Sequence, residues 1–250
     1  DDETIDIAAK NNCKLIHIKK SEFSFGRALN IGCQNASGDI FVIISGHCIP
    51  VDKHWLTNLV TPMLTNRANY VYGRQIGRDT TMFSESLVFK KYFPEKGRHD
   101  FPSYFCNNAN SAIEKIVWSK YKFDENITGL EDLELGKRLY ENGGKITYAN
   151  EACVYHIHNE NWTKIKTRYE RETIAFLNFE PSMKLSLFEI TTGFLLSVFN
   201  DINDEGLKIK NFKHIKSIIQ YRSAQYFGYW VGNKRKQEVN TKTKSRFYYP

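Results

Sequence analysis

The sequence predicts an α/β fold, a mostly parallel sheet flanked by helices, with a helical appendage at the C-terminal end. In residues 1–178, short β-branched and aromatic runs alternate with amphipathic stretches, which is the pattern of strands joined by covering helices. From residue 179 onward such runs cease and the chain becomes helical, aromatic and basic. We therefore expect a sheet-containing domain over residues 1–178 and a helical tail over residues 179–250.

Each element follows from its local pattern. Strands are expected at residues 15–18, 40–44, 69–72, 145–148 and 152–155, and helices at 25–34, 55–64, 114–121, 130–142 and 163–177. Residues 40–44 contain no polar side chain, which predicts a strand buried on both faces. The loop at 45–50 should then lie at the carboxyl end of that strand, where open α/β sheets bind ligands. Residues 78–104 are aperiodic, and we expect a long loop there.

The net charge of +7 favours anionic partners such as nucleotide phosphates, acidic glycans or lipid headgroups. No nucleic-acid-binding motif is present, so nucleic acid is not an expected partner. The five cysteines are odd in number and scattered, which favours a reducing, cytoplasmic location. The longest apolar run, 185–199, is too short to span a bilayer and contains Glu189.

Paired carboxylates, Glu131 and Asp132, open the amphipathic helix at 130–142. Acidic residues at a helix start interact favourably with the helix dipole, and that structural reading alone explains many such pairs. The chemical reading is a general base that accepts a proton from a hydroxyl group. Its position suits this role, since the first turn of the helix should face the ligand-binding edge of the sheet.

Histidines follow two of the predicted strands. His47 ends the triplet Ser45-Gly46-His47, and His156 and His158 follow the last strand. If strand alternation persists, His156 and His158 share one face. His47 is a candidate for a metal ion or a diphosphate, against the alternative of a loop histidine bonded to backbone. The spacing of the histidines and cysteines matches no structural zinc pattern, so a zinc-stabilised module remains a minor alternative.

Several arginines are candidate phosphate ligands because the guanidinium group binds phosphate through two parallel hydrogen bonds. Arg27 and Arg74 each follow a glycine beside a predicted strand end, and they are better candidates than Arg168 and Arg171 on the helix 163–177. The basic residues on that helix are more simply explained as a solvated face.

In order and spacing, these motifs resemble the family-2 glycosyltransferases with a GT-A fold, in the branch that builds bacterial surface polysaccharides. The resemblance covers about residues 1–178. It rests on the following segments: Asp1-Asp2-Glu3-Thr4, Phe25-Gly26-Arg27-Ala28-Leu29-Asn30, Ala36-Ser37-Gly38-Asp39, Ser45-Gly46-His47-Cys48-Ile49-Pro50, Asn108-Ala109-Asn110-Ser111-Ala112-Ile113, Phe123-Asp124-Glu125, Glu131-Asp132-Leu133-Glu134 and Val154-Tyr155-His156.

The resemblance implies a role for each matching residue. Asp132 is the catalytic base, with Glu131 supporting the acceptor or the donor. Residues implied to bind the donor diphosphate are Ser45, Gly46, His47, Arg27, Asn30 and Arg74; those implied on the acceptor side are Asn108 and Asn110. The implied reaction is inverting transfer from a nucleotide sugar, usually with a divalent metal such as Mn²⁺ or Mg²⁺.

The chain departs from the family pattern in two ways. Ser45 and His47 replace the aspartates of the usual Asp-x-Asp metal motif. His47 can still bind a metal together with His156, and metal-independent transfer is the alternative. The family's first strand and helix would lie before Asp1, so we expect a segment upstream of this chain, or another chain in its place.

We therefore predict an inverting glycosyltransferase, cytoplasmic, using a nucleotide-sugar donor and a glycan or lipid-linked glycan acceptor in surface-polysaccharide synthesis. The alternative is a catalytically inactive relative that binds sugars or acts as a scaffold. The tail carries many apolar groups, followed by basic residues: Leu185, Leu187, Phe188, Phe194, Leu195, Leu196, Val198 and Phe199. It is predicted either to contact a membrane surface or partner, or to pack on the domain.

Overall fold

The computed structural model describes residues 3–96, 102–204, 212–235 and 239–249. Its strands are β1 (Ile40–Ile44), β2 (Cys48–Pro50), β3 (Tyr70–Ile76), β4 (Asn110–Glu114) and β5 (Ile146–His156). Its α-helices are α1 (Thr4–Lys10), α2 (Phe25–Asn35), α3 (Trp55–Asn66), α4 (Phe83–Tyr92), α5 (Lys115–Tyr121), α6 (Glu131–Glu141), α7 (Trp162–Phe179), α8 (Leu187–Asn203), α9 (Phe212–Lys234) and α10 (Thr241–Tyr248).

The described strands form one sheet in the order β1-β4-β3-β5-β2. The α/β class is confirmed, but the sheet is mixed rather than mostly parallel. Only β3 and β5 run parallel among the described pairs, while β4 is antiparallel to both of its neighbours and β2 is antiparallel to β5. The strand pattern of the sequence could not distinguish these directions, because helices cover both faces of this sheet and its antiparallel strands therefore also carry apolar side chains on both sides.

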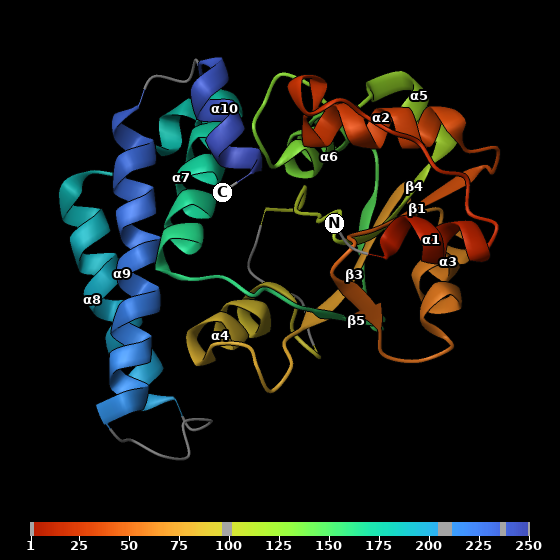
Figure 1. Cartoon of the computed structure of the whole chain (residues 1–250). Coiled ribbons are helices and arrows are strands. Elements are labelled where there is room, and N and C mark those ends of the chain that lie inside the picture. The colour runs from red at the N-terminus through yellow and green to blue at the C-terminus, as the bar shows by residue number, and fades with distance from the viewer. Residues whose placement is uncertain (1–2, 97–101, 205–211, 236–238, 250) are drawn as a thin grey trace.

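Helices cover the two faces of the sheet, and alternation along the strands divides the core between them. Tyr70 and Tyr72 of β3 belong to the larger cluster, which also draws on α2, α4, α5 and α6. Val71, between them, faces Leu59 and Met63 of α3. Figure 1 shows α2, α5 and α6 grouped at one side of the sheet, with α7–α10 forming a separate helical layer. This arrangement leaves the carboxyl end of β3 facing the helical layer.

Several strand predictions need correction. Residues 15–18 form no strand, because no described strand lies beside them to share hydrogen bonds. β1 was expected to be buried on both faces, yet Val42 and Ile44 are exposed, since β1 is the end strand of the described sheet. The 45–50 loop contains the short strand β2, and β3 continues through Arg74 to Ile76.

Strand β5 and helix α4 also differ from expectation. The two short strands predicted around residues 145–155 are one strand, β5, with an irregularity opposite Gly73 and Gln75. At Gly73 the chains approach so closely that an added Cβ would lie 2.2 Å from the Ala152 carbonyl oxygen. The loop expected at 78–104 contains α4, which buries Glu85 and Phe89. Residues 97–101 of that prediction, like Asp1 and Asp2, lie outside the described residues.

The tail packs on the sheet-containing domain through α7. Gly228 and Gly232 of α9 lie against the backbone of Lys166 and Glu170 in α7, at distances where any Cβ would clash. Glu170, fully buried, also binds Arg246 of α10 at 2.6 Å. Helices α9 and α10 thus pack on α7.

Helix α8 is only partly covered by this packing. Its Ile190 is buried, while Phe188, Leu195 and Phe199 are 76%, 59% and 64% exposed. They recur at spacings of seven and four residues, which places them on one outward face of the helix. None of the described helices has the length and hydropathy needed to cross a membrane.

Candidate active site

The carboxylate pair stands at the first turn of α6, as predicted. Leu130, the residue before the helix, has φ of 56°, a left-handed conformation that a leucine rarely adopts. This turn directs Glu131 and Asp132 into the protein, where they are only 8% and 6% exposed. A strained residue next to buried carboxylates is a common feature of functional sites, because the surrounding fold must hold it in place.

Backbone groups fix the Asp132 carboxylate. Its Oδ2 accepts a hydrogen bond from the Asn108 N–H at 2.8 Å, and its Oδ1 accepts one from the Leu133 N–H at 2.7 Å. Helix α6 is held close by Gly136, where an added Cβ would lie 2.5 Å from the Tyr104 carbonyl oxygen. Each carboxylate oxygen retains a further lone pair, so Asp132 can still accept a proton from a substrate.

Burial shapes the acidity of both carboxyl groups. Desolvation, followed by the charge of Asp132, raises the pKa of Glu131 to about 8. Desolvation also raises the pKa of Asp132 to about 6. Hydrogen bonds from the Asn108 and Leu133 backbone favour the ionised form of Asp132, but desolvation outweighs them. At neutral pH the pair therefore carries about one negative charge, and Asp132 is the better candidate to hold it. A carboxylate with a pKa near 6 is well matched to general-base catalysis.

An unpaired donor lies beside this pair. The Nε of Arg171 is buried without a hydrogen-bond partner within the described structure, whereas the side chain of Asn108 acts on Glu131 and favours its ionised form. Arg171 lies next to Gly129, just before α6, and its guanidinium stacks over the Phe25 ring at 4.9 Å. Buried donors are normally satisfied, so the Arg171 Nε indicates a place where a polar ligand supplies the missing acceptor.

Strand pairing brings the histidines together. Cys48 of β2 lies opposite His156 of β5, and the Ile157 N–H donates to the His47 carbonyl oxygen at 3.1 Å. As a result the Nε2 atoms of His47 and His156 are 2.8 Å apart. The expectation that these two side chains face one common site is confirmed. His158 joins them, with its ring centroid 4.2 Å from that of His156.

A hydrogen-bonded path connects the histidines to the carboxylates. The His156 Nδ1–H donates to Gln75 Oε1 at 2.6 Å, and Gln75 Nε2 donates to Asn107 Oδ1 at 2.8 Å. Asn107 is followed by Asn108, whose backbone N–H binds Asp132. The irregular pairing of β3 and β5 places Gln75 beside His156. The two groups of side chains thus belong to one site.

Glu85 and Arg168 complete the histidine side of the site, and neither was predicted as a member of it. Glu85, 4% exposed, accepts from His158 Nδ1 and from Arg168, each at 2.8 Å. Burial acts to raise the pKa of Glu85, but His158 and Arg168 outweigh it and hold that pKa below its ordinary value. Glu85 lies in the segment 78–104, which was predicted to be a loop. Arg168 was assigned to a solvated face, which is wrong, since it also pairs with Glu160 at 2.7 Å.

The other predicted residues occupy different places. Arg27 pairs with Glu22 and Glu125 on the surface, and Asn30 ties α2 to the Phe123 backbone. Asn110 is fully buried, and its amide group bonds to the Trp55 indole and to backbone carbonyls. The polar atoms of Asn30 and Asn110 are thus committed to holding the fold.

The remaining donor-side residues, in the turn at 45–47 and at Arg74, can still bind a ligand. Gly46 has no atom within 4 Å of where a Cβ would be, so the turn beside Ser45 and His47 is open. Ser45 Oγ lies 3.4 Å from His47 Nδ1. Arg74 pairs with exposed Glu95 at 3.5 Å but has an unpartnered buried Nε within the described residues. This side of the site can therefore still accept an anionic ligand.

Burial also keeps the histidines neutral. Desolvation, together with the nearby His158, lowers the pKa of His47. Desolvation, followed by the charges of His158, His47 and Arg168, lowers the pKa of His156 to about 2. Neutral imidazoles offer lone pairs, which is the form in which histidine binds a metal ion or accepts a hydrogen bond.

Comparison with known proteins agrees with this geometry. Residues 1–115 match the family model described as Glycosyl transferase family 2. An O-antigen chain rhamnosyltransferase from Salmonella typhimurium is 24% identical over 234 residues, which cover 88% of this chain and 68% of that protein. A second one, from Salmonella anatum, is 26% identical over 176 residues, which cover 63% of this chain and 54% of that protein. The chain thus spans only part of the length of these relatives.

Solved structures share the fold. A mannosyltransferase from Pyrobaculum calidifontis, in complex with GDP-Man and Mn²⁺, has a TM-score of 0.58 at 10% identity, with 92% of this chain and 72% of that chain covered. The glucosyl-3-phosphoglycerate synthase of Mycobacterium tuberculosis, in complex with phosphoglyceric acid, has a TM-score of 0.50 at 18% identity. The match covers 71% of this chain and 64% of that chain. The sheet and its covering helices therefore have the GT-A fold of these structures.

Proposed function

We propose that this chain, which belongs to glycosyl transferase family 2, moves a sugar from a nucleotide-activated donor to a hydroxyl group of a glycan or lipid-linked glycan during surface-polysaccharide synthesis. The observation that carries the proposal is the buried Glu131–Asp132 pair at the start of α6, flanked by the unpaired Nε of Arg171. The two O-antigen chain rhamnosyltransferases among its relatives support the polysaccharide class of acceptor.

Asp132 acts as the general base. It removes the proton from the acceptor hydroxyl while that oxygen forms a bond to the anomeric carbon of the donor. The bond between the anomeric carbon and the diphosphate oxygen breaks, and its electron pair leaves with the nucleoside diphosphate. Attack opposite the leaving group inverts the anomeric configuration. Glu131 remains protonated at neutral pH because its pKa is raised, so it can donate a hydrogen bond to a substrate oxygen.

The histidine side of the site receives the leaving diphosphate. The turn Ser45-Gly46-His47 is open, and the unpartnered Nε of Arg74 can serve as a donor to phosphate oxygens. His47 and His156 are the side chains that would hold a divalent metal such as Mn²⁺ or Mg²⁺, with imidazole nitrogens facing each other at 2.8 Å. A bound cation would stabilise the charge that develops on the diphosphate.

An inactive, sugar-binding relative is the second candidate, and the replacement of the Asp-x-Asp motif by Ser45-Gly46-His47 favours it. The two candidates differ in turnover. We expect the protein to release nucleoside diphosphate from a matching nucleotide sugar in the presence of acceptor. An Asp132→Asn variant should lose at least ~100-fold of that rate, the size of a general-base contribution. Sugar binding without turnover in both proteins would favour the inactive relative.

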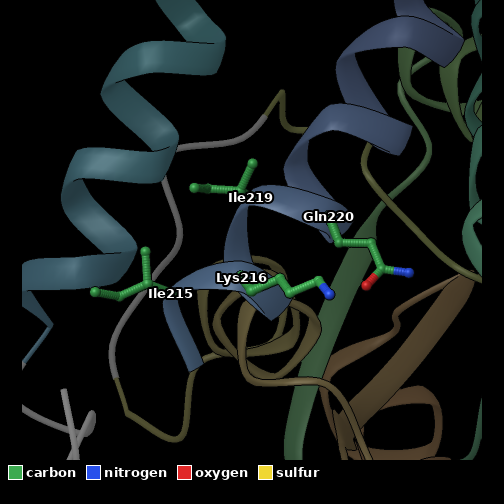
Figure 2. A pocket seen from close by; sticks show the side chains of 4 residues that line it. All are labelled: Ile215, Lys216, Ile219 and Gln220. Carbon is green, nitrogen blue, oxygen red and sulfur yellow. The ribbon is translucent and has the colours of Figure 1, made fainter. Parts of the chain in front are cut away.

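We further propose a cytoplasmic protein that contacts an anionic membrane surface through α8. Phe188, Leu195 and Phe199 form its exposed apolar face. Figure 2 shows a hollow on α9 lined by Ile215, Lys216, Ile219 and Gln220, where a lysine lies beside two isoleucines. Apolar side chains next to lysines suit the boundary between headgroups and acyl chains. A lipid-linked acceptor would be held at the same surface.

The membrane contact is testable with vesicles of phosphatidylglycerol. A Leu195→Ser, Phe199→Ser variant should lose binding at low salt, because it removes two outward apolar groups. A matched control is Leu64→Ser, since Leu64 is 70% exposed but lies on α3. Binding should also weaken with added salt. Equal vesicle binding by the double variant and the wild type would contradict the docking face.

A further inference from the structure

Three buried polar side chains lie beside the carboxylate pair. Tyr70 of β3 and Ser111 of β4 are 0% exposed, and Asn108, just before β4, is 7% exposed. Ser111 pairs with Tyr72 across the two strands, and Tyr70 lies two residues from Tyr72 on the same face of the sheet. As a result, the hydroxyl groups of Tyr70 and Ser111 both donate to Asn108 Oδ1, at 2.5 and 2.8 Å.

These two bonds fix which end of the Asn108 amide faces Glu131. An amide oxygen has two lone pairs, and the two hydroxyl groups occupy both of them. Burial, followed by the nearby Cys106 thiol and the carboxylates of α6, raises the pKa of Tyr70 well above its ordinary value, so its phenol keeps the proton that it donates. With Oδ1 occupied, the amide nitrogen Nδ2 is the end that bonds to Glu131 and favours its ionised form.

The opposite orientation of the amide is unfavourable. If the amide turned over, Nδ2 would face the two hydroxyl groups, and their protons would lose the acceptor that Asn108 Oδ1 provides. Buried hydroxyl groups are normally hydrogen-bonded, so the fold favours the orientation in which Oδ1 faces Tyr70 and Ser111.

Asn108 therefore presents only donors to the two carboxyl groups. Its backbone N–H donates to Asp132 Oδ2 at 2.8 Å, and its side-chain amide donates to Glu131. Because Asn108 offers Glu131 no acceptor, the proton of a neutral Glu131 is not used in a bond to Asn108. That proton remains available for another oxygen.

We propose that Tyr70 and Ser111 are positioning residues that hold the Asn108 amide as a donor to Glu131, so that the Glu131 proton is reserved for a substrate oxygen. Both residues are fully buried and act only through Asn108. The role toward the substrate rests on the proposed function. The orientation of the amide is a property of the folded chain and does not depend on sugar transfer.

This role predicts an effect that a purely structural role does not. Without the two hydroxyl groups the amide can rotate, and Asn108 Oδ1 can then accept the O–H of Glu131. The neutral acid becomes more stable, so the pKa of Glu131, about 8 in the wild type, should rise further. Tyr70 is uncharged, so its replacement by phenylalanine removes no charge near Glu131.

The other titratable groups that act on Glu131 remain in place in these variants. They come from the elements packed around it: Asp132 on α6, Cys106 before β4, Arg171 on α7 and Tyr248 on α10. A change in the pKa of Glu131 therefore reports on the Asn108 amide.

The test is an NMR titration of the Glu131 carboxyl carbon in the full chain, between about pH 5 and pH 10, and it requires no substrate. The resonance is identified by its absence in Glu131→Gln. We expect the double variant Tyr70→Phe, Ser111→Ala to raise the pKa of Glu131 by about 1 pH unit, the usual contribution of one hydrogen bond to a carboxylate. Each single variant should shift the pKa in the same direction.

The matched control is Tyr221→Phe. It removes an equally buried hydroxyl group, which bonds to Tyr169 at 3.0 Å between α9 and α7. This variant should lower the Tm but leave the pKa of Glu131 unchanged. An equal rise of that pKa in the control would overturn the proposal, because the effect would then come from a general loosening of the fold.

The remaining outcomes separate the proposal from the proposed function. An unchanged pKa of Glu131 in the double variant would overturn the proposal. If the double variant does not fold, an unchanged pKa in both single variants has the same meaning. A raised pKa in a protein whose wild type transfers no sugar would support the positioning role and contradict the proposed function. Sugar transfer together with an unchanged pKa would do the reverse.

Discussion

Glu131→Gln should make the protein more stable, because the native structure holds this carboxyl group in its neutral form. The pKa of Glu131 is about 8 in the folded protein, against 4.5 for the free side chain. In this case the folded state binds the proton more tightly than the unfolded state, so wild-type stability falls as pH rises from 4.5 toward 8. A glutamine mimics the neutral carboxyl group and removes that dependence.

The size of the effect follows from the pKa difference. Between pH 4.5 and pH 7, Glu131 ionises in the unfolded state but stays protonated in the folded state. This span of about 2.5 pH units lowers the free energy of unfolding of the wild type by ~3 kcal/mol at pH 7. The gain should shrink to below ~1 kcal/mol at pH 5 and grow to ~4 kcal/mol at pH 8. At neutral pH, ~3 kcal/mol is a rise in Tm of about 6–12 °C for a chain of this size.

Urea denaturation at pH 5, 7 and 8 measures this directly. The control is Glu141→Gln, which neutralises a carboxylate at the opposite end of α6 whose side chain is 57% exposed. It should leave the pH dependence unchanged. A stability gain in Glu131→Gln that is the same at pH 5 and pH 8, or a net loss at pH 8, would refute the assignment of a neutral, buried Glu131.

Two other predictions follow from the same region. The kcat/KM for transfer should fall about tenfold per pH unit below pH 6, because Asp132 must lose its proton to act as a base; a profile that stays flat down to pH 5 contradicts this. Gly136→Ala should destabilise the protein by ~1–3 kcal/mol, since the added methyl group meets the Tyr104 carbonyl oxygen. The matched change Gly32→Ala in α2, where nothing lies within 4 Å, should be neutral or stabilise by up to ~1 kcal/mol in urea unfolding.

The sequence predicted the local elements of the sheet-containing domain well, because their hydrophobic patterns are strong. The helix that begins at Glu131 and ends before Gly143 was located to within a residue, and its first-turn carboxylates were recognised. The pairing of His47 with His156 was also anticipated, because each follows a strand. The local pattern could not predict strand direction, because both faces of this sheet are covered and its antiparallel strands also carry apolar side chains on both sides.

The parts of the site that were missed depend on tertiary contacts. Glu85 and Arg168 lie far apart in the sequence and meet only when α4 and α7 pack together. Helix α4 was missed because its apolar residues lack a clear helical period, although Phe89 is buried. Asn110 is predicted on the acceptor side from its motif. However, it is buried and its Oδ1 accepts a hydrogen bond from the Trp55 indole, so it stabilises the fold. These outcomes require three-dimensional contacts that spacing alone does not contain.

The central claim is that Asp132 is the catalytic base, and the rate of single-turnover sugar transfer by Asp132→Asn tests it most directly. Both Asp132 oxygens accept backbone N–H groups, so the asparagine should also lower stability by ~1–3 kcal/mol. The assay therefore runs well below the Tm of the variant, with donor binding measured on the same sample. We predict at least ~100-fold slower transfer with donor affinity nearly unchanged. Transfer at a rate close to that of the wild type would contradict the account.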